Sequence, residues 1–160
     1  MTPHNASTVP ISIRLASAGD IPFIQTCTNE AYTPYIERMG RKPAPMLADF
    51  ALHVTQQEVF VAESDCTSIG VLILVDRPTH LLLESVCVTL RFHSRGIGRQ
   101  LISFAEQTAI ERGYTRIELH THQAMVENIA MYQHLGFTIT NRRVVDDFER
   151  VYFRKNLVSV

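Results

Sequence analysis

The sequence predicts a mixed α/β domain, in which antiparallel strands come first and a strand–helix–strand–helix–strand arrangement follows. Segments in the first half alternate apolar and polar residues or form short apolar runs, which is typical of strands. Two later segments, beginning near Gly96 and Met125, instead place apolar residues at helical spacing. The chain has 160 residues and contains no repeat or linker. One domain spanning residues 1–160 is therefore expected, with a loose N-terminus over residues 1–10.

The first predicted strand, Ile11–Leu15, alternates apolar and polar residues. A helix is expected to follow, because Ser17 can cap its start and Asp20, three residues on, resembles the acidic partner of a capping box. This helix is predicted to run to about Tyr32, since Pro34 disturbs its end.

A proline-broken connection then leads to a short helix predicted from about Met46. Two strands, Glu58–Ala62 and Ile69–Val75, are expected to be joined by a polar turn around Asp65. The next run, Leu81–Val88, is more continuously apolar and is therefore predicted to be a central strand.

The second half begins with an amphipathic helix that is predicted from Gly96 to about Gly113. The remaining expected elements are the strand Arg116–His120, the helix Met125–His134 and the strands Phe137–Thr140 and Val151–Arg154.

Composition narrows the class of protein. Apolar residues make up 46% of the chain and charged residues 19%, with a formal net charge of −1. That balance excludes disorder and predicts no nucleic-acid partner, whose binding needs a broad basic face. Three cysteines without a C-x-x-C pair, together with the absence of a signal sequence or membrane-spanning run, predict a cytoplasmic protein that is not bound to a membrane.

The segment Arg-Gly-Ile-Gly-Arg, residues 95–99, is the strongest sign of a ligand. It joins a predicted strand to a predicted helix, where backbone N–H groups lack partners and the helix dipole favours an anion. A P-loop would need a lysine after its second glycine, and a dinucleotide motif would need a third glycine where Leu101 stands. Neither pattern is present, so the segment indicates another kind of phosphate site.

From Leu81 onward the chain resembles the GNAT superfamily of acyl-CoA-dependent N-acetyltransferases. Four pieces carry the resemblance: the strand LLLESVCV, the turn HSRGIGRQLI, the helix ENIAMYQHLGF and the closing segment RRVVDDFERVYFRK. The resemblance implies a mostly antiparallel sheet of six or seven strands, splayed in the middle and flanked by about four helices. The chain departs from the usual pattern at two positions, where His93 replaces Gln or Arg and Leu90 replaces a proline.

The resemblance also implies the binding site for acetyl-CoA. Amides of residues 94–99 would hold the pyrophosphate, and main-chain groups near residues 86–88 would bind the pantetheine arm and stabilise the oxyanion. His93 can still donate a hydrogen bond to a phosphate oxygen. The residues expected to bind the cofactor are Val86, Cys87, Val88, His93, Ser94, Arg95, Gly96, Ile97, Gly98, Arg99 and Asn128.

Two catalytic residues follow from the same resemblance. Glu84 would act, directly or through water, as the general base toward the substrate amine; the alternative is a strand carboxylate that pairs with an arginine or orders the substrate. Tyr132 would protonate the departing thiolate. Because a free tyrosine has a pKa of about 10 and a thiol about 8.5, Tyr132 must be acidified for that transfer, or else it only donates a hydrogen bond.

The acceptor site is less clearly marked. The candidates for its wall are Tyr32, Tyr35, Arg38 and Met39, which could equally pack a loop onto the core. Two further patterns are expected to carry no chemistry. His120-x-His122 lacks a third ligand for a metal, and Cys87 is expected to be a buried, inert thiol.

The predicted function is transfer of an acetyl group from acetyl-CoA to a primary amine of a small molecule, by direct attack in a ternary complex and without a metal. One alternative acceptor is a protein or peptide amine. A different class, a non-catalytic acyl-CoA-binding regulatory module, would keep the turn but need neither Glu84 nor Tyr132. The resemblance leaves a homodimer open.

Overall fold

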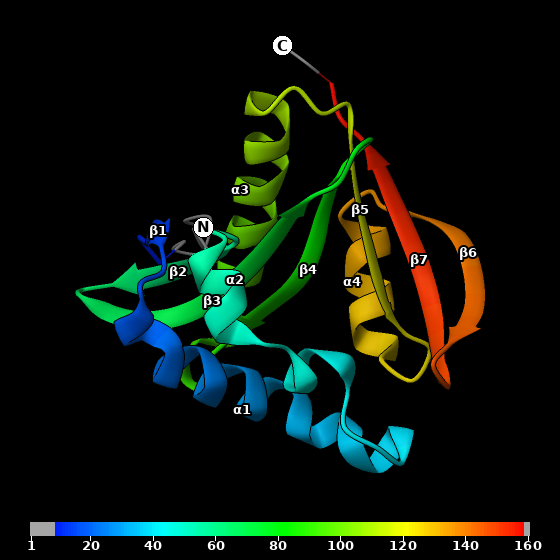
Figure 1. The fold of residues 1–160 in the computed structure, drawn as a ribbon, viewed down its shortest axis with the longest axis horizontal. Helices are drawn as coiled ribbons and strands as arrows, with labels where there is room; N and C mark the ends of the chain where they lie inside the picture. Colours follow the sequence, from blue (N-terminus) through cyan, green and yellow to red (C-terminus); the bar gives the residue numbers. More distant parts are fainter. Residues whose placement is uncertain (1–8, 159–160) are drawn as a thin grey trace, which may run out of the picture.

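Seven strands form one sheet in the order β1-β2-β3-β4-β5-β7-β6, as seen in a computed structural model that describes residues 9–158 (Figure 1). The loose N-terminus predicted over residues 1–10 thus lies almost wholly outside the described residues. The strands are β1 (Ser12–Leu15), β2 (Val59–Ser64), β3 (Thr67–Asp76), β4 (Leu81–Val88), β5 (Arg116–His122), β6 (Thr138–Val145) and β7 (Phe148–Asn156).

All neighbouring strands pair antiparallel except β4 and β5, which are parallel. The sequence prediction of antiparallel strands followed by a strand–helix–strand crossover is confirmed. β4 is the fourth of the seven strands, so its apolar composition did indicate a central position.

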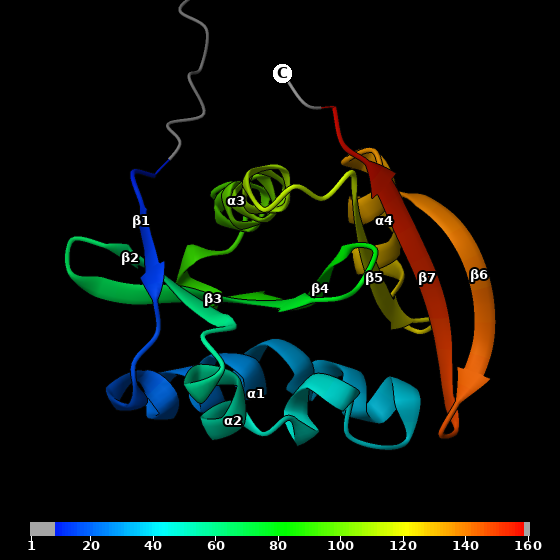
Figure 2. The same ribbon diagram turned by 45° about the horizontal axis from the view of Figure 1, so that its top comes forward.

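Four helices cover the sheet: α1 (Ile21–Met39), α2 (Phe50–Thr55), α3 (Ile97–Glu111) and α4 (Val126–His134). Figure 2 shows α1 and α2 under one face of β2–β4 and α3 above the other, with α4 lying against β5 and β7. The apolar stripe of α3 is fully buried, as its 3.6-residue spacing predicts; it comprises Leu101, Ile102, Ala105 and Ala109.

The first helix is longer than the sequence predicts. It continues through Pro34 to Met39 and ends where Gly40 adopts the left-handed conformation, with its N–H donating to the carbonyl of Ile36. Proline removes one backbone donor, and here contacts outside the helix hold its last turn. Arg38 forms a two-point ion pair with Glu127 on α4, at 2.8 Å for both bonds.

Two other regions depart from the prediction. In place of one short helix from Met46, the chain forms a 3₁₀ turn (Ala44–Leu47) and then α2, whose start is capped by the Asp49 carboxylate accepting from the Leu52 N–H. The last two strands are also longer than expected and form an extended hairpin at the sheet edge. Within the described residues, no helix has both the length and the apolar composition needed to cross a membrane.

Candidate active site

Strand β4 carries a β-bulge at Glu84. Its register with β3 passes from the Ile73–Ser85 pair directly to the Leu74–Leu83 pair, which leaves Glu84 without a partner residue. A bulge inserts one unpaired residue, bends the strand and redirects the side chains beyond it. The only charged residue of β4 therefore stands at the point where the strand changes direction.

The bulge also changes which face of the sheet the following residues occupy. Leu83 packs in the core cluster under α3, whereas Cys87 packs in the cluster under α1. Strict alternation would have placed both on one face. Cys87 is 5% exposed, which confirms the predicted burial, and its Sγ lies 3.3 Å from that of Cys27. That contact, together with burial, raises the pKa of Cys27, so its thiol remains protonated.

Strands β4 and β5 separate just before the bulge. Their parallel pairing is limited to Leu81–Ile117 and Leu82–Glu118, so the edge of β4 that faces β5 has no strand partner from residue 83 onward. This is the splay in the middle of the sheet that the resemblance implied. An unpaired strand edge offers main-chain donors and acceptors to an extended, peptide-like ligand.

Two side chains already contact this free edge. The Tyr32 hydroxyl donates to the Val86 carbonyl at 3.3 Å, and Nε2 of His93 lies 2.8 Å from the Val88 carbonyl. In an antiparallel strand the N–H and C=O of one residue lie on the same edge, so the amides of Val86 and Val88 also face the opening. With Nε2 donating to Val88, a neutral His93 has only an acceptor left at Nδ1, so it has no donor left for the phosphate oxygen that the sequence prediction assigned to it.

A long groove, here called the outer groove, lies between this half of β4, the start of α3 and helix α4. It has an empty volume of about 1280 Å³, counting space open to solvent. Most of the predicted cofactor residues line it, namely Val86, Cys87, Val88, His93, Ser94, Gly96, Gly98, Arg99 and Asn128. The other two do not line it: Ile97 is buried with the α3 core, and the Arg95 guanidinium sits 5.1 Å from the Phe92 ring centre.

The turn before α3 has the geometry of an anion site. Ser94 and Gly96 both have positive φ, at 61° and 79°, and the first backbone bond of the helix runs from the Gln100 N–H to the Gly96 carbonyl. The N–H groups of residues 97–99 thus have no intrahelical acceptor. The N-cap is a glycine without a side chain to satisfy them, so these three donors remain available to a phosphate.

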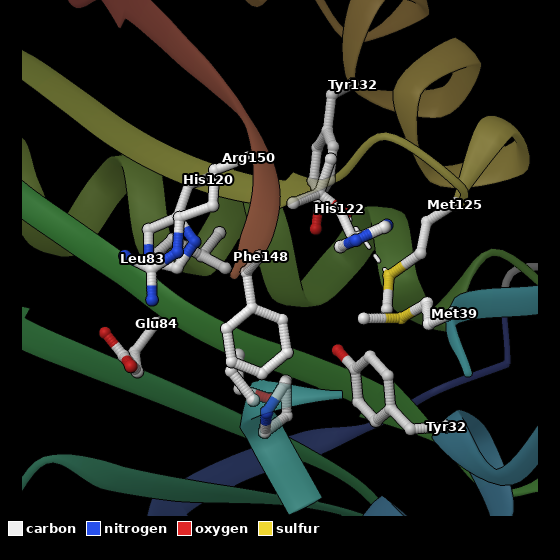
Figure 3. Close-up of a pocket in the computed structure, with 14 residues that line it drawn as sticks. Tyr32, Met39, Leu83, Glu84, His120, His122, Met125, Tyr132, Phe148 and Arg150 are labelled. Carbon is white, nitrogen blue, oxygen red and sulfur yellow. Dashed lines mark hydrogen bonds between the residues drawn. The ribbon is translucent and has the colours of Figure 1, made fainter. Parts of the chain in front are cut away.

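A second cavity, here called the inner pocket, lies on the other side of the splay and has an empty volume of about 590 Å³, counting space open to solvent. Residues 83–85 of β4 line it, directly before the residues that line the outer groove. Figure 3 shows the Tyr132 hydroxyl entering the pocket from α4 and the Tyr32 hydroxyl approaching from α1. The two cavities therefore meet at the bulged, unpaired part of β4.

Tyr132 is held in a fixed position by aromatic packing. Its ring lies 5.8 Å from Phe137 and 5.6 Å from Phe153, centre to centre, and the residue is 6% exposed. Burial raises its pKa, and the nearby Tyr35 adds to the shift. The protein alone therefore keeps Tyr132 protonated, and its hydroxyl is available as a hydrogen-bond donor.

The residues predicted for the acceptor wall are divided between several sites. Tyr32 and Met39 line the inner pocket, whereas Tyr35 lines the outer groove. Arg38 is engaged with Glu127 and lies 5.1 Å from the Tyr35 ring centre. The structure thus brings only the first two together beside Glu84 and Tyr132.

Sequence reasoning did not assign three groups of the inner pocket, His120 and His122 from β5 and Arg150 from β7. The signal was present, since partly exposed polar residues alternate with buried ones along β5 and over residues 150–154 of β7, but only the splay shows which cavity they face. In residues 9–158 no three metal-ligating side chains gather. Nδ1 of His122 accepts from the Ala124 N–H at 3.0 Å, so a neutral His122 carries its proton on Nε2.

We expect His120 to make the stability of the fold depend on pH. Burial, helped by the charge of Arg150, lowers its pKa to about 4, against about 6.5 when unfolded. Between these two values the unfolded chain binds more protons, so the stabilisation present above pH 6.5 is lost as the pH falls toward 4. The loss amounts to about 3 kcal/mol.

We expect His120→Gln to remove this part of the acid sensitivity. Between pH 6.5 and 4 the variant's free energy of unfolding should fall by about 3 kcal/mol less than that of the unmodified protein. Urea denaturation at a series of pH values measures this difference, with the exposed His134→Gln as control. Parallel curves for the His120 variant and the unmodified protein would contradict the assignment.

Comparison with known proteins agrees with this geometry. Residues 24–137, well over half of the chain, match the sequence model described as Acetyltransferase (GNAT) family. Mouse N-alpha-acetyltransferase 80 is 35% identical over 80 residues, which are 44% of this chain and 24% of the mouse protein. The match thus spans about a quarter of that relative's length.

Solved structures show the same fold. A GNAT family acetyltransferase from Elizabethkingia anophelis with acetyl-CoA bound superposes with a TM-score of 0.70 at 21% identity, over 92% of this chain and 98% of that one. Naa50 from Arabidopsis thaliana, in complex with the bisubstrate analogue CoA-Ac-MVNAL, also gives 0.70, at 14% identity over 92% and 99%. At these identities the likeness concerns the fold.

Proposed function

The chain belongs to the GNAT acetyltransferase family, and from this premise we propose that it transfers an acetyl group from acetyl-CoA to a primary amine. The observation that carries the proposal is the junction of the two cavities on β4. The outer groove ends where the inner pocket begins. Glu84, Tyr32 and Tyr132 line the inner pocket (Figure 3), and the Tyr32 hydroxyl also donates to Val86, which lines the outer groove. A cofactor in the groove and an amine in the pocket would meet there.

The outer groove has the donors and acceptors that acetyl-CoA requires. The N–H groups of residues 97–99 face outward at a helix start, where a pyrophosphate binds favourably. The free amides of Val86 and Val88 can pair with the peptide-like arm, and Asn128 lines the same groove from α4. When bound, acetyl-CoA supplies an acetyl thioester whose sulfur leaves as a thiolate.

Each residue of the junction has a distinct role in the proposed reaction. Glu84 accepts the proton of the amine, directly or through a water it orders, and it makes no ion pair with any described residue that would neutralise it. Tyr132 donates a hydrogen bond to the departing sulfur. An amide of the free β4 edge stabilises the negative oxygen that forms on the acetyl group.

Replacing Glu84 with Gln tests the first role. The amide preserves the shape of the side chain but cannot take a proton, so kcat/KM for the amine should fall about 100-fold. Acetyl-CoA affinity, measured by calorimetry, should stay within a few-fold. Glu111→Gln, on the exposed end of α3, is the matched control. An unchanged kcat/KM in Glu84→Gln would reduce Glu84 to a structural residue.

We propose a small molecule as the acceptor, because contacts between distant segments of the chain border the inner pocket at Phe148. The Arg41 guanidinium stacks on Phe148, 3.8 Å from the ring centre, and donates to the Asp146 carbonyl at 3.0 Å. These contacts join the segment after α1 to the turn between β6 and β7. Because Phe148 also lines the inner pocket, we expect this bridge to favour small acceptors over bulky ones.

A peptide or protein α-amine is the second candidate acceptor, because the mouse relative is an N-alpha-acetyltransferase by name. A panel of small primary amines and short peptides, assayed with acetyl-CoA for release of free thiol, separates the two. The proposal predicts that small amines are acetylated with the higher kcat/KM. Acetylation of peptides alone would reverse the order, and acetylation of neither would remove the enzymatic proposal.

A further inference from the structure

Two arginines face each other at the edge of the sheet beside the inner pocket. Arg143 on β6 and Arg150 on β7 are direct cross-strand partners. Neither forms an ion pair with any residue in the described part of the chain. Like charges directly opposite on neighbouring strands are destabilising. Such a pair therefore indicates a site that gains from binding an anion.

Tyr152 adds a hydroxyl to this pair. The Arg143 guanidinium carbon lies 4.7 Å from the Tyr152 ring centre, and that ring lies 5.7 Å from the ring of His120. Burial opposes ionisation of the Tyr152 hydroxyl, but the neighbouring guanidinium groups of Arg143 and Arg150 outweigh it and lower the pKa. The charges of two cations thus act on one hydroxyl.

This cluster continues into the inner pocket. Arg150 and His120 line the pocket together with Glu84, and Figure 3 shows them reaching from β7 and β5 toward the side where Glu84 stands. Glu84 and Arg150 belong to strands on either side of the splay and form no ion pair with each other. The pocket therefore presents a carboxylate and a guanidinium that are both available to a ligand, and a ligand with both charges can bind both.

We propose that the acceptor carries a carboxylate close to its amine, and that Arg150, supported by Arg143 and Tyr152, binds this carboxylate while the amine faces Glu84. The inference rests on the proposed acetyl transfer and specifies its substrate class. A guanidinium offers a planar pair of donors that matches a carboxylate, which favours this anion. The carboxylate can belong to a free amino acid or to an acidic residue at the start of a peptide.

The first experiment measures binding, so that it does not depend on turnover. With CoA present, calorimetry compares amino acids with their amides, which keep the amine but lose the negative charge. We expect the acids to bind at least about tenfold more tightly, as a charged hydrogen bond in a cavity provides. Equal affinities for acids and amides would overturn the inference, as would no binding of either combined with no preference for peptides that begin with an acidic residue.

Variants of Arg150 and Arg142 show which residue produces the preference for acids over amides. Arg150→Met should make the affinities for an amino acid and its amide equal. Arg150→Lys should restore part of the preference for the acid. Arg142→Met is the matched control, because Arg142 pairs with Val151 one register position away and points to the other face of the strand. Its preference for the acid should equal that of the unmodified protein. A preference that survives in Arg150→Met, with the thermal midpoint maintained, would contradict the assignment.

Turnover measurements then show whether the carboxylate belongs to a free amino acid or to a peptide. They also separate the inferred carboxylate site from the proposed acetyl transfer. Peptides that begin with an acidic or a neutral residue are compared with free amino acids by thiol release. Acetylation of amines without any preference for a nearby carboxylate would refute the inference and leave acetyl transfer intact. Carboxylate binding through Arg150 without acetylation of any amine would support the anion site and contradict the proposed reaction.

Discussion

Replacing Tyr132 with Phe is expected to lower kcat by at least about 100-fold, the usual cost of removing one hydrogen-bond donor from a group that becomes charged during the reaction. The change removes only the hydroxyl. The ring would keep its packing against Phe137 and Phe153, and the outer groove, which Tyr132 does not line, should bind acetyl-CoA with unchanged affinity.

The environment of Tyr132 defines which role it can have. A thiol has a pKa of about 8.5 and a free tyrosine about 10, and burial raises the pKa of Tyr132 further. Full proton transfer to the sulfur is therefore uphill. Of the two roles left open by the sequence, the hydrogen-bond donor is the one this environment supports.

Two measurements check this prediction. Single-turnover kinetics give the rate of thiol release, and calorimetry gives acetyl-CoA affinity. Tyr114→Phe is the control, since the Tyr114 hydroxyl donates a hydrogen bond to Asp76 at 3.0 Å, beyond the end of α3. Equal rates for Tyr132→Phe and the unmodified protein would remove Tyr132 from the mechanism, and loss of acetyl-CoA binding would show that the residue acts on affinity.

Gly98→Asp should weaken acetyl-CoA binding by at least about 100-fold without destabilising the fold. A carboxylate at this position would lie among the amides of residues 97–99 and repel a pyrophosphate by several kcal/mol at short range. The protein itself has room for the side chain, because a Cβ on Gly98 meets no atom within 4 Å. An acidic residue in the first helical turn also stabilises the helix through its interaction with the helix dipole, and α3 has no acidic residue there.

Affinity and stability should thus change independently in this variant. The thermal midpoint of Gly98→Asp should equal or exceed that of the unmodified protein, while calorimetry shows the loss of affinity. Gly98→Ala separates size from charge and should cost much less. Normal acetyl-CoA binding by Gly98→Asp would mean that the phosphates bind elsewhere.

Local sequence signals predicted well the elements that line the outer groove. The bounds of β4 agree with the prediction at both ends, and the turn before α3 lies where the glycines indicated. These features depend on residues adjacent in the chain, namely an apolar run, two glycines and an amphipathic helix. The backbone N–H groups of the turn follow from that local geometry alone.

The inner pocket depends on contacts between distant segments, and sequence patterns do not determine these. Alternation along β5 shows that His120 lies on one face, but the splay from β4 decides that this face lines a pocket. The bulge at Glu84 comes from the register with β3. Likewise, the pairing of Arg143 with Arg150 depends on the register of an extended hairpin whose length the prediction underestimated.

The most direct test of acetyl transfer follows both products at once, with acetyl-CoA and an acceptor amine mixed with the unmodified protein and with Tyr132→Phe. Free thiol and N-acetylated amine should appear in equal amounts with the unmodified protein, only when the amine is present, and at least about 100-fold more slowly with the variant. Tight binding of acetyl-CoA with no acetylated amine from any acceptor would contradict this account, and would indicate a binding module that uses the same turn at residues 95–99.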